Sequence, residues 1–289
     1  MPSPTSSTTS STTSNTTART APAGAGTAAP RIGRVRPLLT YILLETLRTL
    51  RHPANLFFVI AFPLVMFLVF SGIVSGQATS GADGDYISAT IMLAMAGFSS
   101  CLSAASTASA AAVELNEGWG RQMALTPRGL VGYAQVKVLA TAASAAVPVG
   151  VVVAAGALTT AQAPARVWVL GPLLCLVSAL PFVLWGLAVG LWLPPQASVG
   201  IATSLVSLFG FLGNTFMPLS ETLLSIGRLT PMYGPTALAR WPLTHGWVYA
   251  TDAPSFQDPL WIPVVNLVGW TLIFAALVAL ARHRMTVRR

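Results

Sequence analysis

Charged residues are scarce in this sequence. Only 16 Lys and Arg and 8 Asp and Glu occur among 289 residues, whereas 54% of the residues are hydrophobic and the mean hydropathy is +0.68. A soluble domain of this length needs a charged surface that this composition does not supply. The composition therefore excludes an ordinary soluble globular domain and indicates a membrane protein.

Lysine occurs once and cysteine twice. The single lysine, Lys137, follows no glycine-rich loop, and a phosphate-binding P-loop needs a lysine directly after such a turn. Direct ATP binding by this chain is therefore excluded. Cys101 and Cys175 both fall within apolar runs, where a thiol behaves as a small apolar group. Neither a disulfide between them nor a metal site is expected.

Histidine is also rare, and His52, His245 and His283 all lie outside the long apolar runs. A serine such as Ser99 therefore has no base within its own span, and nucleophilic catalysis needs one within hydrogen-bond reach. An intramembrane enzyme is not expected. A secondary carrier usually keeps an ionisable group at membrane depth, and the apolar runs have none. Secondary transport remains the alternative to ATP-driven transport.

Long uncharged runs dominate the rest of the sequence. A helix needs about 20 apolar residues to cross a bilayer, and six stretches without Asp, Glu, Lys, Arg or His meet that length. The sequence predicts an all-α membrane protein with six transmembrane helices. They are Ala54–Gly76, Ile87–Val113, Val138–Thr160, Trp168–Leu193, Ser198–Met217 and Trp261–Ala281.

The few basic residues are unevenly distributed between these spans. If the N-terminus is cytoplasmic, thirteen of the sixteen lie on the cytoplasmic side, and only Arg166, Arg228 and Arg240 lie outside. Acidic residues such as Asp83 and Asp252 fall on the outer side. The positive-inside rule then predicts that both termini are cytoplasmic. The basic excess reports this orientation, and no nucleic-acid partner is expected.

The N-terminal part has two segments. Residues 1–37, rich in Ser, Thr, Ala and Pro, are predicted to form a disordered cytoplasmic tail before a transmembrane domain at 38–289. From Leu38 to His52, leucines at helical spacing share one face and polar residues another. This pattern predicts an amphipathic helix in the cytoplasmic interface, ended by Pro53.

Two further stretches have unusual composition. The second span contains the run SSCLSAASTASAAA, which favours close helix packing over the alternative of a polar-lined path. Between the fifth and sixth spans, Pro218–Leu260 is moderately apolar but is broken by Gly and Pro. We expect one or two short re-entrant helices there, on the outer side and buried against protein.

A short charged segment, ELNEGWGRQMALTPRGLVGY at 114–133, separates the second and third spans. This segment resembles the corresponding one in the ABC-2 family of ABC transporter permeases. The resemblance rests on its Glu-x-x-Glu-Gly, its Leu-Thr-Pro and the Tyr and Lys that follow. The preceding Arg-rich helix, Pro63 in NLFFVIAFPLVMF, and the outer segment with Pro218, Pro231 and Arg240 agree in order. The resemblance covers about residues 38–289, although the 114–119 part is more apolar here than in many members.

This resemblance implies a bacterial exporter subunit in the cytoplasmic membrane. Two permease chains, identical or different, would pair with two separate ABC ATP-binding subunits that hold ATP and Mg. The segment Glu114–Pro127 would form the coupling helix seated in the ATPase. Its expected contact residues are Glu114, Glu117, Gly118, Trp119, Arg121, Met123 and Pro127. The uncharged spans favour a hydrophobic or amphipathic cargo, such as a drug-like or antibiotic-like metabolite or a lipid-linked molecule.

Overall fold

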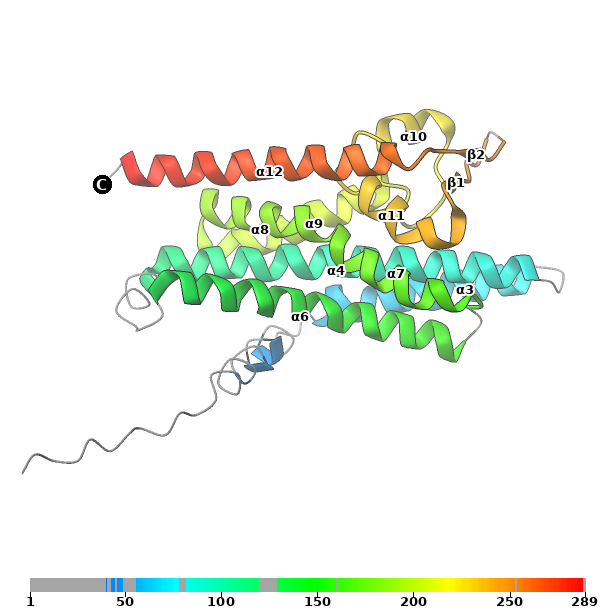
Figure 1. Ribbon diagram of the computed structural model, residues 1–289, viewed down its shortest axis with the longest axis horizontal. Coiled ribbons are helices and arrows are strands. Elements are labelled where there is room, and N and C mark those ends of the chain that lie inside the picture. Colours follow the sequence, from blue (N-terminus) through cyan, green and yellow to red (C-terminus); the bar gives the residue numbers. More distant parts are fainter. Residues whose placement is uncertain are drawn as a thin grey trace, which may run out of the picture.

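The computed structural model describes residue 40, residues 43–44, 46–48, 56–77, 82–119, 129–159, 161–252 and 254–287. Most of these residues are helical (Figure 1). In chain order the elements are η1 (Phe57–Ala61), α3 (Phe62–Gln77), α4 (Ala82–Glu114), η2 (Leu115–Trp119), α6 (Gly129–Leu158), α7 (Ala165–Ser178), α8 (Leu180–Trp192), α9 (Pro195–Leu212), α10 (Glu221–Gly227), α11 (Tyr233–Thr244), β1 (Trp247–Val248), β2 (Phe256–Gln257) and α12 (Trp261–Val287).

Five of the described helices are long and apolar enough to cross a membrane, so the described chain is that of a helical multi-pass membrane protein. They correspond to the predicted second to sixth spans. They are Tyr86–Gly118, Lys137–Leu158, Ala165–Trp192, Pro195–Leu212 and Trp261–Arg284. The apolar helix at the predicted first span, Phe57–Ile73, is shorter.

Helix α4 lies at the centre of the bundle. It packs against α3, α6, α7, α8, α9 and α11, and most of its residues are buried. Figure 1 shows it running the length of the molecule, with α6 along one side and α8 and α9 along another. Its Ser- and Ala-rich sequence suits this position, because small side chains let several helices approach one axis at once.

The closest approach is between α4 and α8. Gly186 and Gly190, one helical turn apart, face the backbone of α4. A Cβ added to Gly186 would lie 2.2 Å from the carbonyl oxygen of Ala105, and one added to Gly190 would lie 2.6 Å from that of Ser109. The predicted packing role of the small residues is therefore confirmed, and it depends on glycines of the partner helix as well.

Hydroxyl groups of α4 bond to neighbouring helices. Ser100 Oγ donates to the Cys175 carbonyl at 2.8 Å, and Ser103 Oγ donates to the Ser144 carbonyl at 2.9 Å. The thiols of Cys101 and Cys175 are buried and free. These buried hydroxyls pair with helix carbonyls, so they join α4 to α6 and α7.

Three details differ from the sequence prediction. The predicted fourth span is divided at Ala179 into α7 and α8. Pro181, in the first turn of α8, has no N–H to continue the backbone hydrogen bonds of α7. Helix α9, which corresponds to the predicted fifth span, ends at Leu212 rather than at Met217, because Asn214 adopts a left-handed conformation with a φ of 57°. The structure is also not purely helical. Strands β1 and β2 pair antiparallel, and two residues each are too few to show an alternating pattern.

The N-terminal predictions are described only in part. The tail at 1–37 lies outside the described residues, as do most residues of the predicted amphipathic helix. Within that helix, Thr40, Leu43, Leu44 and residues 46–48 are helical. Leu43 and Leu47 are exposed, whereas Thr46 is buried. An exposed leucine face is what a helix lying against lipid requires.

Candidate functional site

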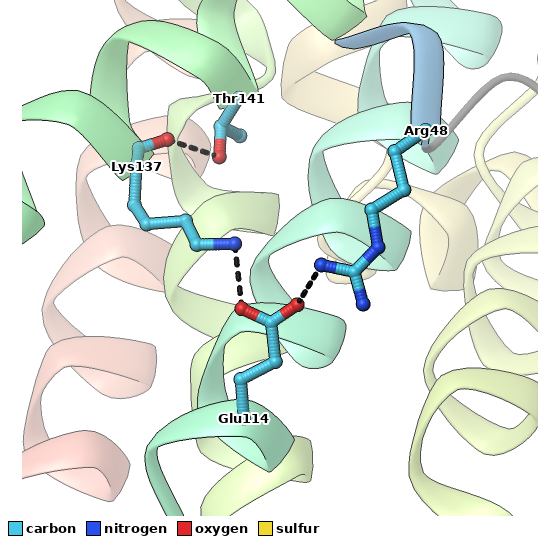
Figure 2. Close-up of polar contacts among 4 residues, drawn as sticks. All are labelled: Arg48, Glu114, Lys137 and Thr141. Carbon is cyan, nitrogen blue, oxygen red and sulfur yellow. Dashed lines mark hydrogen bonds and ion pairs between the residues drawn. The ribbon is translucent and has the colours of Figure 1, made fainter. Parts of the chain in front are cut away.

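At one end of the bundle, a single carboxylate joins three parts of the chain. Glu114, the last residue of α4, binds Lys137 Nζ of α6 at 2.7 Å through Oε2. Its Oε1 accepts a hydrogen bond from Arg48 Nη1 at 3.1 Å. Figure 2 shows both basic groups reaching the same carboxylate from opposite sides. Glu114 therefore fixes the spacing of the second and third spans and ties the N-terminal helical segment to them.

The two ion pairs differ in exposure. The Lys137 side chain is 9% exposed and that of Glu114 20%, whereas that of Arg48 is 69% exposed. Exposed pairs contribute little because water screens them, and a buried ion that loses its partner costs several kcal/mol. The Glu114–Lys137 pair is therefore the stronger constraint. Thr141 Oγ1, one turn along α6, donates to the Lys137 carbonyl at 2.8 Å.

Beyond Glu114 the chain departs from regular α-helical geometry. Residues Leu115–Trp119 form a π-helical turn, in which Gly118 has a φ of 101°. Only glycine adopts this conformation without strain, because other residues place a Cβ against the backbone. The expected coupling helix from Glu114 to Pro127 is therefore interrupted at Gly118. Asn116 Nδ2 anchors the turn by donating to the Gly190 carbonyl of α8 at 3.2 Å.

The structure describes only part of the segment that the sequence grouped. Glu114 binds basic side chains of its own chain, and its expected contact with a partner protein stays a prediction. Glu117 is exposed. Arg121, Met123 and Pro127 lie outside the described residues, as does the side chain of Trp119. Their contacts with a partner stay predictions.

At the opposite end, α10, α11 and the β1–β2 pair form a cap (Figure 1). Asp258 is buried in this cap and binds Arg228 Nη2 at 2.5 Å, and it also accepts a hydrogen bond from the Tyr233 hydroxyl. Burial lowers the pKa of Arg228, but its bonds with Tyr233 and Asp258 outweigh burial and raise it. Burial, followed by the bond to Asp258, raises the pKa of Tyr233. At neutral pH the network therefore holds a charged arginine and a neutral phenol.

Asn266 of α12 holds this cap against the last span. Its Nδ2 donates to the carbonyls of Arg228 at 2.7 Å and Thr230 at 2.9 Å. Its Oδ1 accepts from the Gly234 amide at 3.1 Å. One side chain thus satisfies three backbone groups in the turn between α10 and α11, where Pro231 is buried.

A cavity of about 980 Å³ lies between this cap and the ends of α3 and α4. Most of its lining is apolar or aromatic, including Phe70, Phe216 and Trp241. Pro218 lies at its edge and is exposed. Arg240 also lines it, donating to the carbonyls of Asn214 at 2.9 Å and Thr215 at 3.0 Å. Burial lowers the pKa of Arg240 to about 10, so the side chain stays protonated at neutral pH.

Sequence reasoning found Arg240 but missed its partners and both buried ion pairs. The signals available were that Lys137 is the single lysine and that Asp258 is one of the few acids between residues 218 and 260. Neither fact alone identifies a partner. Within the described part of the chain, no group of three or more His, Cys, Asp or Glu is placed to hold a metal ion.

Comparison with known proteins gives a likeness to a protein named as a transport permease. No protein-family model matches the chain. It is 24% identical over 246 residues to a Bacillus subtilis (strain 168) protein named "Putative transport permease YvfS". The match spans 83% of this chain and 94% of that protein.

Proposed function

We propose that the chain is the membrane-spanning permease subunit of an ATP-driven exporter. The observation that carries this proposal is the likeness to a transport permease along 94% of that protein, in a chain whose helices suit a bilayer. The order of the charged segment, the spans and the Pro-containing outer segment supports the ABC-2 type in particular.

In this proposal ATP and Mg bind to other polypeptides. The single lysine of the chain, Lys137, is buried in α6 and binds Glu114, so it is not part of a phosphate-binding loop. Two ATP-binding subunits would serve two permease chains, either two copies of this chain or this chain and a different one.

The Glu114 cluster suggests how movement of an ATPase would reach the spans. Segment 115–128 directly follows Glu114, and Glu117 on it is exposed. Because Glu114 binds both Lys137 and Arg48, a force on this segment acts on α4, α6 and the N-terminal helix together. The turn at Gly118 lets the segment leave the axis of α4.

The proposed topology has six spans, with Phe57–Ile73 and its flanking residues as the first. Both termini are cytoplasmic, and the membrane is the bacterial cell membrane. Helices α10 and α11 then lie at the outer face as short re-entrant helices. The cargo is hydrophobic or amphipathic, either a drug-like or antibiotic-like metabolite or a lipid-linked compound, because the spans hold almost no charge.

Reconstitution tests this proposal. Purified alone, the chain should hydrolyse no ATP. Inside-out vesicles that contain the chain and its ATP-binding subunit should accumulate doxorubicin, an amphipathic fluorescent drug, when ATP is supplied. Uptake should continue when an uncoupler collapses the proton gradient. Uptake that needs the gradient but not ATP would replace the proposal with a secondary carrier.

A further inference from the structure

The cavity beneath the outer cap is lined by a partly buried cation, Arg240, that has no counter-ion among the described side chains. No described Asp or Glu forms an ion pair with Arg240, which lines the cavity. Asp258 also lines the cavity, but it already binds Arg228 and Tyr233. Removing a charge from water is costly unless an opposite charge or several hydrogen bonds compensate it. Arg240 is therefore an incompletely compensated charge.

The hydrogen bonds of Arg240 are also incomplete. A guanidinium has five N–H donors, and Nη1 and Nη2 each donate to one carbonyl, those of Asn214 and Thr215. Among the described residues its Nε, which is buried, has no hydrogen-bond partner. Buried polar groups are normally satisfied, so unsatisfied groups beside a cavity indicate a missing ligand.

The rest of the cavity fits an apolar body. Residues Ile87 and Ile91 of α4, Phe70 of α3 and Trp241 and Leu243 of α11 contribute to its walls. Its volume of about 980 Å³ is at the upper end of ordinary ligand pockets, which are about 300–1,000 Å³. Polar side chains, among them Thr236, His245 and Asp258, also line the cavity beside these apolar walls.

We propose that this cavity binds an anionic amphiphile, with its carboxylate or phosphate at Arg240 and its apolar body between α3, α4 and α11. The two carbonyls that hold Arg240 fix the guanidinium at the wall without neutralising it, so an anion adds both charge and hydrogen-bond acceptors. Such a ligand is either a membrane lipid or a transported compound, since both present the same chemistry.

Tryptophan quenching tests the site directly. The probe is 9,10-dibromostearic acid, a carboxylate whose bromines quench tryptophan, and its methyl ester is the uncharged match. The purified full chain in neutral detergent should show saturable quenching by the acid at a concentration at least about tenfold lower than by the ester. The saturable part should decrease in Trp241→Phe and disappear when Trp247→Phe is added, because both tryptophans line the cavity.

Substitutions of residues that line the cavity separate the effect of the Arg240 charge on binding from the effect of cavity volume. Arg240→Met should bind acid and ester equally. Arg282→Met removes a charge of the same sign near the C-terminal end of α12, outside the cavity lining, and should keep the preference for the acid. Ala237→Phe fills the cavity without removing a hydrogen bond and should weaken both ligands. If Arg240→Met does not fold, the acid–ester comparison on the wild-type chain and the Ala237→Phe variant still decide the question.

Equal binding of acid and ester by the wild-type chain overturns the proposal, as does an acid preference that survives in folded Arg240→Met. Brominated phosphatidylglycerol in nanodiscs identifies the source. If free stearic acid reverses little of the quenching by brominated phosphatidylglycerol, the ligand at this site is a lipid. If stearic acid reverses the quenching readily, the ligand is a soluble carboxylate. The assay needs no ATP-binding subunit, so its result is independent of the proposed exporter function.

Discussion

At the scale of single residues, Glu114 has the most consequential contacts. Replacing it by Gln removes the carboxylate that Lys137 Nζ binds at 2.7 Å, while the shape of the side chain is kept. We expect Glu114→Gln to lower the free energy of unfolding by about 2–3 kcal/mol, near the lower limit for breaking a buried pair because Glu114 is partly exposed. Thermal unfolding of the purified protein measures this loss.

Glu117 provides the matched control, because it lies on the same segment and is exposed. Glu117→Gln should change stability by less than about 0.5 kcal/mol. Adding Lys137→Met to Glu114→Gln should recover most of the loss, since the buried ammonium is then gone. Equal melting temperatures for the two single variants would show that the cluster does not stabilise the fold.

These residue-scale contacts were mostly beyond prediction from the sequence. Glu114 and Lys137 are 23 positions apart, and Arg228 and Asp258 are 30 apart, so their pairing depends on how helices rotate and pack. Sequence patterns report the face of one helix and not its neighbour. The segment at 114–119 was recognised as special, but the intramolecular role of Glu114 was not.

At the scale of elements, the α4–α8 contact tests why the small residues are there. Gly186→Ala places a Cβ 2.2 Å from the Ala105 carbonyl oxygen, and backbone cannot move as a side chain can. We expect a loss of about 1–3 kcal/mol from overpacking, which exceeds the gain of about 0.5–1 kcal/mol in helix propensity. The melting temperature in a fixed detergent should fall accordingly.

Gly200 of α9 is the matched control for this change. A Cβ at that position meets nothing within 4 Å, so Gly200→Ala should leave the protein as stable or slightly more stable. If both alanine variants melted alike, the close approach of α4 and α8 would not be a source of stability.

The attachment of the cap to α12 depends on Asn266. Asn266→Leu keeps the side-chain volume but leaves the carbonyls of Arg228 and Thr230 and the amide of Gly234 without this partner. Each unsatisfied buried group costs about 1–3 kcal/mol, so we expect a clear loss of stability and faster proteolysis of the cap.

A hydroxyl on the same helix offers the comparison. Thr271→Val removes only a bond to the Leu267 carbonyl within α12, and it should have a much smaller effect. Proteolysis of the two variants at the same rate would mean that Asn266 does not hold the cap.

The elements themselves were largely predictable, for a plain reason. An uncharged run of about 20 residues is needed to cross a bilayer, and five such runs became the five long helices. The kink at Ala179, the end of α9 at Leu212 and the β1–β2 pair were missed, because they depend on single backbone conformations and short pairings. Continuous apolar composition conceals such breaks.

At the scale of the whole molecule, the distribution of charge predicts how the chain lies in the membrane. Thirteen of the sixteen basic residues fall on the side assigned to the cytoplasm. In a chain without its two native cysteines, Asp252→Cys should react with an impermeant maleimide added outside intact cells. A cysteine added after Arg289 should react only after the cells are opened. Labelling of Asp252→Cys from the inside alone would reject the six-span topology.

The proposed assembly makes the last prediction, at the segment that follows Glu114. If it docks in an ATP-binding subunit, the aromatic ring of Trp119 is its natural anchor, since large aromatics at interface centres contribute about 2 kcal/mol or more. Trp119→Ala should therefore weaken co-purification of the ATP-binding subunit at least about tenfold. Glu117→Arg reverses an exposed charge beside it and should impair assembly most at low salt.

Both changes lie beyond Glu114, in the proposed docking segment, so we expect the permease still to insert and to unfold at its usual temperature. Membrane level and melting temperature are therefore measured beside ATPase recovery. A stable permease with a lost partner identifies the segment as the docking site, because a merely structural turn would lose both together. Full recovery of the ATP-binding subunit by the Trp119→Ala, Glu117→Arg double variant would mean that the partner binds elsewhere and that the Gly118 turn only connects two spans.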